Sequence, residues 1–311
     1  MELLKKLSDA SGVSGRETIV RDIIIEELEK NSIEFHQDIM GNILVKKGNG
    51  SKKLMISAHM DEVGFITTFI DKGFLRVSNI GDIKIESLDG ELIKINGSIG
   101  KIVNTKNEDD INSVFVDMAA DKTVNINEGD TASFIPGFKK EKSYISGKAL
   151  VSRALCYILL DIIKKSAPKD LTVYFVFTVQ NELNGRGARA AAYSVNPDYA
   201  LVLEGENSND YPGAEGNISL NHGPVLRIMD KVLIMHHQVS EIIEKAAEKA
   251  KVILQKTVSN ESSEGGELHK EVSGIKAGVL ALPIRYKHSS LEIIGKKDLE
   301  DLTKLLLNII E

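Results

Sequence analysis

The hydrophobic positions of this chain follow two alternating patterns, which together predict an α/β protein. Four runs are apolar on both faces and are typical of buried strands, at residues 54–59, 171–180, 199–206 and 277–286. Elsewhere apolar residues recur at helical spacing, at 19–28, 155–163, 240–251 and 297–310. Strands that alternate with helices favour a mixed, mostly parallel sheet flanked by helices.

The segment before the first buried run predicts a helix and two short strands. Ser14 followed by Glu17 fits a capping box, which would open the helix. The short strands are expected at 33–37 and 42–47, ahead of a turn-forming GNGSKK sequence.

Residues 66–144 have a different texture. Short β-type runs are separated by Gly, Asn and Asp turns, which is typical of a small all-β domain. We therefore predict two domains: an α/β domain made of residues 1–65 and 145–311, and an inserted β domain of residues 66–144.

Composition narrows the functional classes. The net charge of −6 is spread over 311 residues without a basic stripe, so nucleic acid is not an expected partner. The only cysteine, Cys156, excludes an internal disulfide and is expected to be a buried thiol. No apolar run reaches the roughly 18 residues of a membrane span, and no signal peptide is evident, so we expect a cytoplasmic protein without membrane contact.

Candidate metal chemistry begins where the first buried run ends, at His59 and Asp61. Alternation along a strand sends these two side chains to the same side, which suits a metal-binding histidine whose ring is oriented by a carboxylate. A surface His and Asp at a strand end is the alternative. Ligands of such sheets lie beyond the carboxyl ends of the strands. Those ends also carry Asn181, Glu182, Glu204, Glu206 and His288.

Several segments, in order, resemble the tetrahedral and glutamyl aminopeptidases, a family of metallopeptidases with two metal ions that are often labelled cellulase or endoglucanase M. The matching segments are SGVSGRE, DIMGN, AHMDEVGF, GKALVSRALC, FVFTVQNELNGRGA, PDYALVLEGE, HGPVLRIMD and PIRYKHSSLE. The resemblance covers nearly the whole chain. It implies a zinc-peptidase-like sheet whose inserted domain is a β-barrel used for dimerisation.

The resemblance assigns site residues one at a time. It implies that His59 and Glu204 bind one metal ion, and that Glu182 and His288 bind the other. It places Asp61 beside the first histidine as the carboxylate that supports its ring.

Three positions, in two segments, depart from the family pattern. Val151 stands where the family has an aspartate that bridges both ions, and Ser152 replaces a second acidic residue. Asn181 stands at the position of the general-base glutamate, and an amide cannot shuttle protons near neutral pH. A catalytic zinc site normally has about three protein ligands. We therefore expect a divalent metal, zinc or cobalt, at reduced affinity or occupancy.

Other polar residues could line or complete the site. Glu264 falls where relatives carry an aspartate, and His269 follows it closely, so either could compensate for the lost bridge. His236 falls on a family histidine near the substrate groove, which suggests a pocket residue. The alternative for each is a solvated carboxylate, or a histidine bonded to the backbone.

Three functions remain open. The first is an aminopeptidase by ancestry that releases N-terminal residues from short peptides, with weak or absent turnover. The second is a non-catalytic paralogue that binds peptides or assembles oligomers, either a homo-oligomer between dimer and dodecamer or a mixed oligomer with an active paralogue. The third is a glycoside hydrolase, although the sequence offers no carboxylate pair with a defensible spacing for that chemistry.

Overall fold

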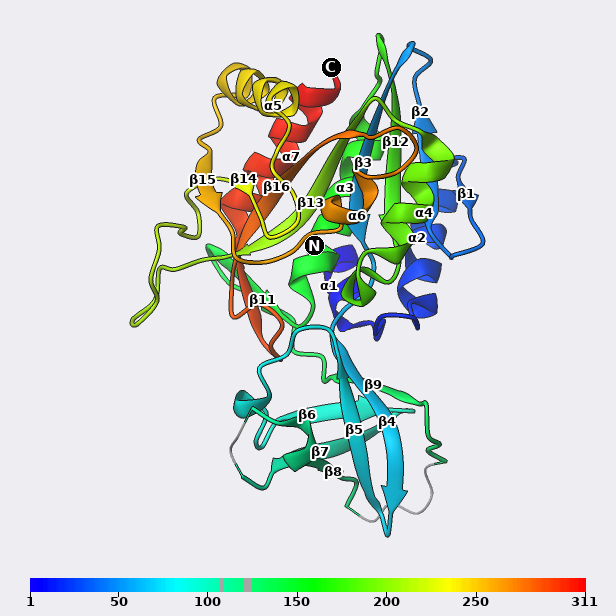
Figure 1. Cartoon of the computed structure of the whole chain (residues 1–311), viewed down its shortest axis with the longest axis vertical. Helices are drawn as coiled ribbons and strands as arrows, with labels where there is room; N and C mark the ends of the chain where they lie inside the picture. Colours follow the sequence, from blue (N-terminus) through cyan, green and yellow to red (C-terminus); the bar gives the residue numbers. More distant parts are fainter. Residues whose placement is uncertain (107–108, 120–124) are drawn as a thin grey trace.

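The structure, a computed structural model, describes residues 1–106, 109–119 and 125–311. An α/β part carries both the first and the last elements of the chain, and a small barrel projects from it (Figure 1). Among the described residues no helix is both long enough and apolar enough to span a bilayer.

Eleven strands form the sheet of the α/β part within the described ranges. Its central strands are mutually parallel and correspond to the four predicted buried runs: β12 (Leu171–Thr178), β3 (Lys52–His59), β13 (Tyr199–Asn207) and β16 (Lys276–Arg285), in this order. The antiparallel flanks are β1 (His36–Gln37) and β2 (Ile43–Lys47) beside β12, then β17 (Glu292–Gly295), β11 (Tyr144–Gly147) and β10 (Lys139–Lys140) beyond β16. Strand β14 (Val225–Met229) pairs with β16 and with β15 (Gln255–Val258). The predicted mixed sheet is confirmed.

Helices cover both faces of the sheet, which explains why the central strands are apolar on both sides. On β3, Ile56 packs in a cluster with α3 (Leu150–Lys165), while its neighbour Met55 packs in a separate cluster with α4 (Arg186–Val195). The first cluster also takes in α1 (Glu2–Asp9), α2 (Thr18–Lys30), α5 (His237–Ala250) and α7 (Lys296–Ile310), and the second takes in α6 (Gly265–Leu268).

The inserted part is a closed antiparallel barrel, in agreement with the predicted β-barrel. Its strands follow the order β4 (Gly64–Asp71), β5 (Phe74–Ile80), β8 (Val114–Asp117), β7 (Ser98–Asn104), β6 (Leu92–Ile95) and β9 (Thr131–Phe134). Phe65 and Phe134 meet edge to face inside it, with ring centroids 5.8 Å apart. The domain limits at 66 and 144 remain a prediction; strand β10, at 139–140, pairs within the larger sheet.

The predicted capping box is wrong, although its helix exists. Helix α2 begins at Thr18, and its N-cap residue Glu17 makes no side-chain cap bond. The Glu17 carboxylate instead accepts hydrogen bonds from the backbone N–H groups of Gly15 and Gln180, at 2.7 and 3.0 Å. This long-range contact ties the start of the helix to the loop after β12.

Cys156 is a free, buried thiol in α3, as predicted. Its Sγ donates to the carbonyl oxygen of His59 at 3.2 Å. Burial raises the pKa of the thiol to about 12.

Candidate functional site

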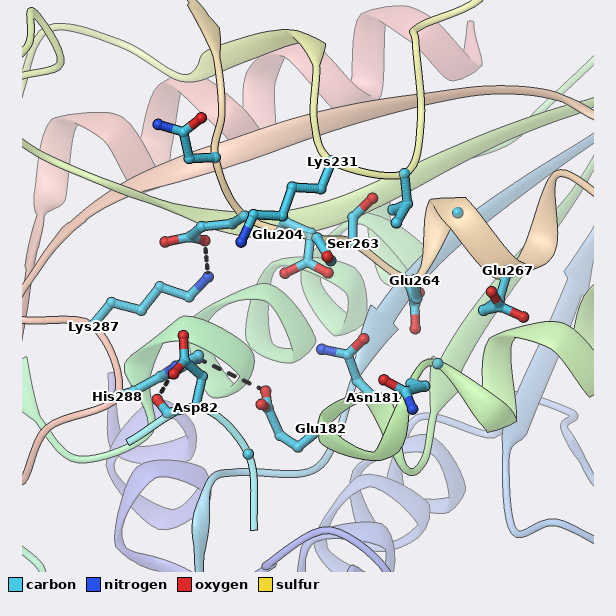
Figure 2. Close-up of a pocket in the computed structure, with 18 of the residues that line it drawn as sticks. Asp82, Asn181, Glu182, Glu204, Lys231, Ser263, Glu264, Glu267, Lys287 and His288 are labelled. Carbon is cyan, nitrogen blue, oxygen red and sulfur yellow. Dashed lines mark hydrogen bonds and ion pairs between the residues drawn. The ribbon is translucent and has the colours of Figure 1, made fainter. Parts of the chain in front are cut away.

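The carboxyl ends of three central strands, β12, β13 and β16, border one cleft, as the α/β topology predicts. Its volume is about 820 Å³. Strand β13 supplies Glu204, a short 3₁₀ turn (Asn181–Leu183) follows β12, and His288 lies just past the end of β16. Figure 2 shows the side chains of Asn181, Glu182, Glu204, Glu264 and His288 around this cleft.

His59 and Asp61 form the predicted pair at the end of β3. Nδ1 of His59 lies 3.4 Å from Oδ1 of Asp61, and its Nε2 lies 4.0 Å from Oε2 of Glu204. Burial alone would lower the pKa of His59, but the neighbouring carboxylates, Asp61 above all, raise it to about 9. The other Asp61 oxygen accepts the backbone N–H of Glu182 at 2.8 Å, which fixes the 3₁₀ turn against β3.

The second predicted donor pair, Glu182 and His288, also comes together. Nε2 of His288 lies 3.8 Å from Oε1 of Glu182, while its Nδ1 is 2.9 Å from the carbonyl oxygen of Asp82. Burial raises the pKa of Glu182 to about 7 and, with help from the charge of Lys287, lowers the pKa of His288 to about 4. Burial thus disfavours the charged form of both side chains.

A hydrocarbon side chain borders the space next to both donor pairs. Val151, in the first turn of α3, is 4% exposed, and together with His59, Asp61, Glu182 and His288 it borders a space of only about 10 Å³. A Cβ atom on Gly205 would lie 2.5 Å from its Cγ2, so the valine packs directly against β13. The backbone N–H of Val151 donates to Glu292, whose other oxygen accepts from the N–H of His288.

These residues do not fit a pair of metal ions. Among the described residues no group of three or more His, Cys, Asp or Glu side chains is arranged to hold a metal ion. Each predicted pair supplies two donors, and the Val151 side chain beside them offers no oxygen. Two buried atoms near this point, Nε2 of His59 and Oε1 of Glu264, have no hydrogen-bond partner in the described structure.

The additional candidates occupy different places. Glu264 is 1% exposed in the cleft wall, where Thr178 donates to it at 2.8 Å and burial raises its pKa to about 7. His236 and His269 are absent from the cleft lining that the structure describes. His236 caps α5 by accepting the N–H of Gln238, and Nδ1 of His269 contacts the carbonyl oxygen of Gly265.

The sequence analysis missed a buried lysine next to the second histidine. Nζ of Lys287 lies 2.5 Å from Oε2 of Glu261 and donates to the carbonyl oxygen of Gly205 at 3.2 Å. Burial opposes its charge, but Glu261 and Glu204 outweigh burial and raise the pKa of Lys287. The only signal in the sequence was a cation directly before His288 in RYKHS.

Three of the residues with a left-handed backbone lie at the edges of the site. Ala149, Gln180 and His288 have φ values of 55°, 56° and 62°, in the left-handed region that side chains disfavour. Ala149 precedes α3, Gln180 precedes the 3₁₀ turn, and His288 is the second predicted histidine itself. Such conformations are costly and collect at functional sites.

Comparison with known proteins agrees with this architecture. The sequence matches the M42 glutamyl aminopeptidase family over residues 41–305. A protein of Acetivibrio thermocellus, provisionally named an aminopeptidase, is 34% identical and aligns over 99% of this chain and 98% of its own length.

Solved structures of similar proteins have the same fold over the whole chain. The TET aminopeptidase of Thaumarchaeota archaeon SCGC AB-539-E09 superposes with a TM-score of 0.94 at 28% identity, over 100% of this chain and 95% of that one. The Pyrococcus horikoshii TET1 peptidase, which can assemble into a tetrahedron or a large octahedral shell, has a TM-score of 0.87 at 27% identity, over 99% and 98%.

The sheet is mixed, histidines and carboxylates lie at its strand ends, and the barrel is inserted after the end of β3. This combination defines a metallopeptidase-type protein. More narrowly, the chain belongs to the M42 glutamyl aminopeptidase family. Peptidases of this family depend on two divalent metal ions, which supports a divalent metal for this chain in general terms.

Proposed function

We propose that this protein binds the N-terminal end of short peptides in its cleft and hydrolyses them weakly or not at all. One observation carries the proposal: Val151 borders the same small space as His59, Glu182 and His288 and offers no oxygen ligand, and no group of three ligand side chains is found among the described residues. Asn181 lies at the family's general-base position and cannot take a proton from water. Loss of a general base alone typically lowers the rate by about 10²- to 10⁴-fold.

Peptide binding does not need the missing chemistry. A peptide N-terminus carries an ammonium group, and Glu182, Glu204 and Glu264 place carboxylates in the cleft that can receive it. The volume of about 820 Å³ falls in the range of ordinary ligand pockets. Asn181 is able to donate to a peptide carbonyl and accept from a peptide N–H.

The test joins metal content to turnover. The purified chain is incubated with zinc, cobalt or manganese, analysed for bound metal, and assayed with aminoacyl-nitroanilides and with short peptides. We expect low metal occupancy, little turnover, and peptide binding that an N-terminal acetyl group abolishes. Metal-dependent turnover at the level of active relatives, lost in His59→Ala, would refute the proposal.

We also propose that the chain forms a homo-oligomer through its barrel. Phe69 is 56% exposed and Ile99 is 58% exposed, and Phe74, at 44%, stacks edge to face on Phe115. These large apolar side chains lie on the inserted barrel, which the family resemblance links to dimerisation. Light scattering on the wild type and on Phe74→Ser tests the idea, since an unchanged mass in the variant would contradict it.

A further inference from the structure

Several carboxylate side chains are buried close together in this site. Asp61, Glu204 and Glu264 are 0%, 3% and 1% exposed, and Glu182 lies beside them. A buried anion requires a positive partner or a proton. His59 lies among these carboxylates and is one such partner. A further cation near the site would balance their charge in place of metal ions.

Lys287 supplies such a charge from within the chain. Its side chain is 7% exposed, and Figure 2 shows it extending into the cleft above His288. Nζ lies 2.5 Å from Glu261 and 3.2 Å from the carbonyl oxygen of Gly205, the residue directly after Glu204. The ammonium group is thus fixed beside the predicted ligand Glu204 by two oxygens.

A second buried cation stabilises the same strand end. Nη2 of Arg227 lies 2.6 Å from Oε2 of Glu206 and 3.1 Å from the same Gly205 carbonyl oxygen that Lys287 uses. It also lies 3.8 Å from Glu261. Arg227 is committed to Glu206 by a further bond from Nε at 2.8 Å. Lys287, by contrast, lines the cleft with its side chain largely buried.

We propose that Lys287 is a built-in cation that takes over the charge of a metal ion in this site and keeps divalent ions out of it. This rests on the proposed function in one respect, namely that the site works without the metal pair. Like charges at close range in a buried site repel strongly. A divalent ion at Glu204 would therefore have to displace the ammonium group from Glu261 and Gly205.

The test measures metal affinity rather than activity. Zinc and cobalt binding are followed by equilibrium dialysis with elemental analysis, on the wild type and on Lys287→Met, which keeps most of the apolar stem and removes the charge. We expect the variant to bind at least about tenfold more tightly, since a charge at contact distance contributes that much or more. Lys287→Arg keeps the charge and should bind metal as poorly as the wild type.

Lys231→Met is the matched control, because Lys231 lines the same cleft but is exposed and has no ion pair in the described part of the chain. It should leave metal affinity within about threefold of the wild type, as expected for an exposed charge. Equal gains in both methionine variants would overturn the proposal, because the effect would then belong to the net charge of the cleft. If Lys287→Met fails to fold, Lys287→Gln retains hydrogen bonding to Gly205 and gives the same comparison.

The two proposals fail in different ways. Unchanged metal affinity in Lys287→Met and Lys287→Gln would refute the proposed role of Lys287 and would leave the proposed function unaffected. Tight metal binding by the wild type without turnover would overturn the role of Lys287 and the expected low metal occupancy, but not the proposed weak hydrolysis. Tight metal binding with efficient turnover would overturn both.

Discussion

Restoring the two lost groups, with Val151→Asp and Asn181→Glu together, is the most direct test of the residue assignments. An aspartate at 151 would place another carboxylate beside Asp61, Glu182 and Glu292, which border the same space of about 10 Å³. Burying an unpaired charge in place of an apolar side chain costs about 3 kcal/mol or more. The variant should therefore be less stable than the wild type when a chelator is present.

Metal should reverse this loss in the double variant. Binding to the folded state alone stabilises it by about 2.7 kcal/mol at a metal concentration of 100 times Kd. A chain of this order of size loses about 2–4 °C in melting temperature per kcal/mol. The melting temperature of the double variant should therefore fall by about 6–12 °C in chelator and regain most of this loss in zinc or cobalt. Peptidase activity should rise by about 10²- to 10⁴-fold from the restored base.

Thermal melts in chelator and in metal, with nitroanilide turnover on the same samples, give the measurement. Val151→Asn with Asn181→Gln is the control, because it has similar volumes without the charges and should show no metal-dependent shift. If the melting temperature of the double variant does not change with zinc or cobalt, Val151 and Asn181 do not occupy the assigned positions. Adding Lys287→Met should increase the metal response further.

Three other predictions concern parts of the molecule outside the metal question. Because burial raises its pKa to about 12, Cys156 should resist iodoacetamide at pH 8 in the native protein and react fully in denaturant, as mass spectrometry would show; ready labelling of the folded chain would contradict its burial. The Arg285 side chain lowers the pKa of Asp210 to about 2, so this carboxylate contributes stability above pH 4 that is lost as the pH falls toward 2. Arg285→Met should thus lower the unfolding free energy by about 1–2 kcal/mol at pH 7, a figure already reduced because the ion pair is partly exposed. Denaturant titrations should show that this difference from the wild type shrinks below pH 4, and a difference that stays constant with pH would count against the assignment. Gly187→Ala should destabilise the protein by about 2 kcal/mol or more, because the new Cβ would lie 2.4 Å from the carbonyl oxygen of Val179, whereas an unchanged denaturation midpoint would mean that the loop is free to shift.

The sequence was sufficient to predict the sheet because burial on both faces leaves a direct signal. The apolar runs at 54–59 and 171–180 became adjacent parallel strands, and their polar ends meet where Asp61 accepts the backbone N–H of Glu182. The capping box failed for the opposite reason. Glu17 bonds to Gln180, a partner far away in the chain that no local pattern reveals.

The site was predictable only in part. The family resemblance named His59, Glu182, Glu204 and His288, and the structure brings them together in two pairs. Lys287 was missed because an isolated lysine in a sequence usually indicates a solvated side chain. Its role depends on Glu261 and on the Gly205 carbonyl group, contacts that exist only once β13 and β16 lie side by side.

The left-handed backbone at Ala149 has a consequence for protein engineering and for the history of the chain. Such a conformation suits glycine, so Ala149→Gly should increase stability by about 1 kcal/mol in chemical denaturation. In an efficient enzyme, loosening the residue that leads into α3 would carry a catalytic penalty. Here the proposed loss of turnover removes that constraint, so a substitution that relieves the strain at this turn should carry no catalytic cost.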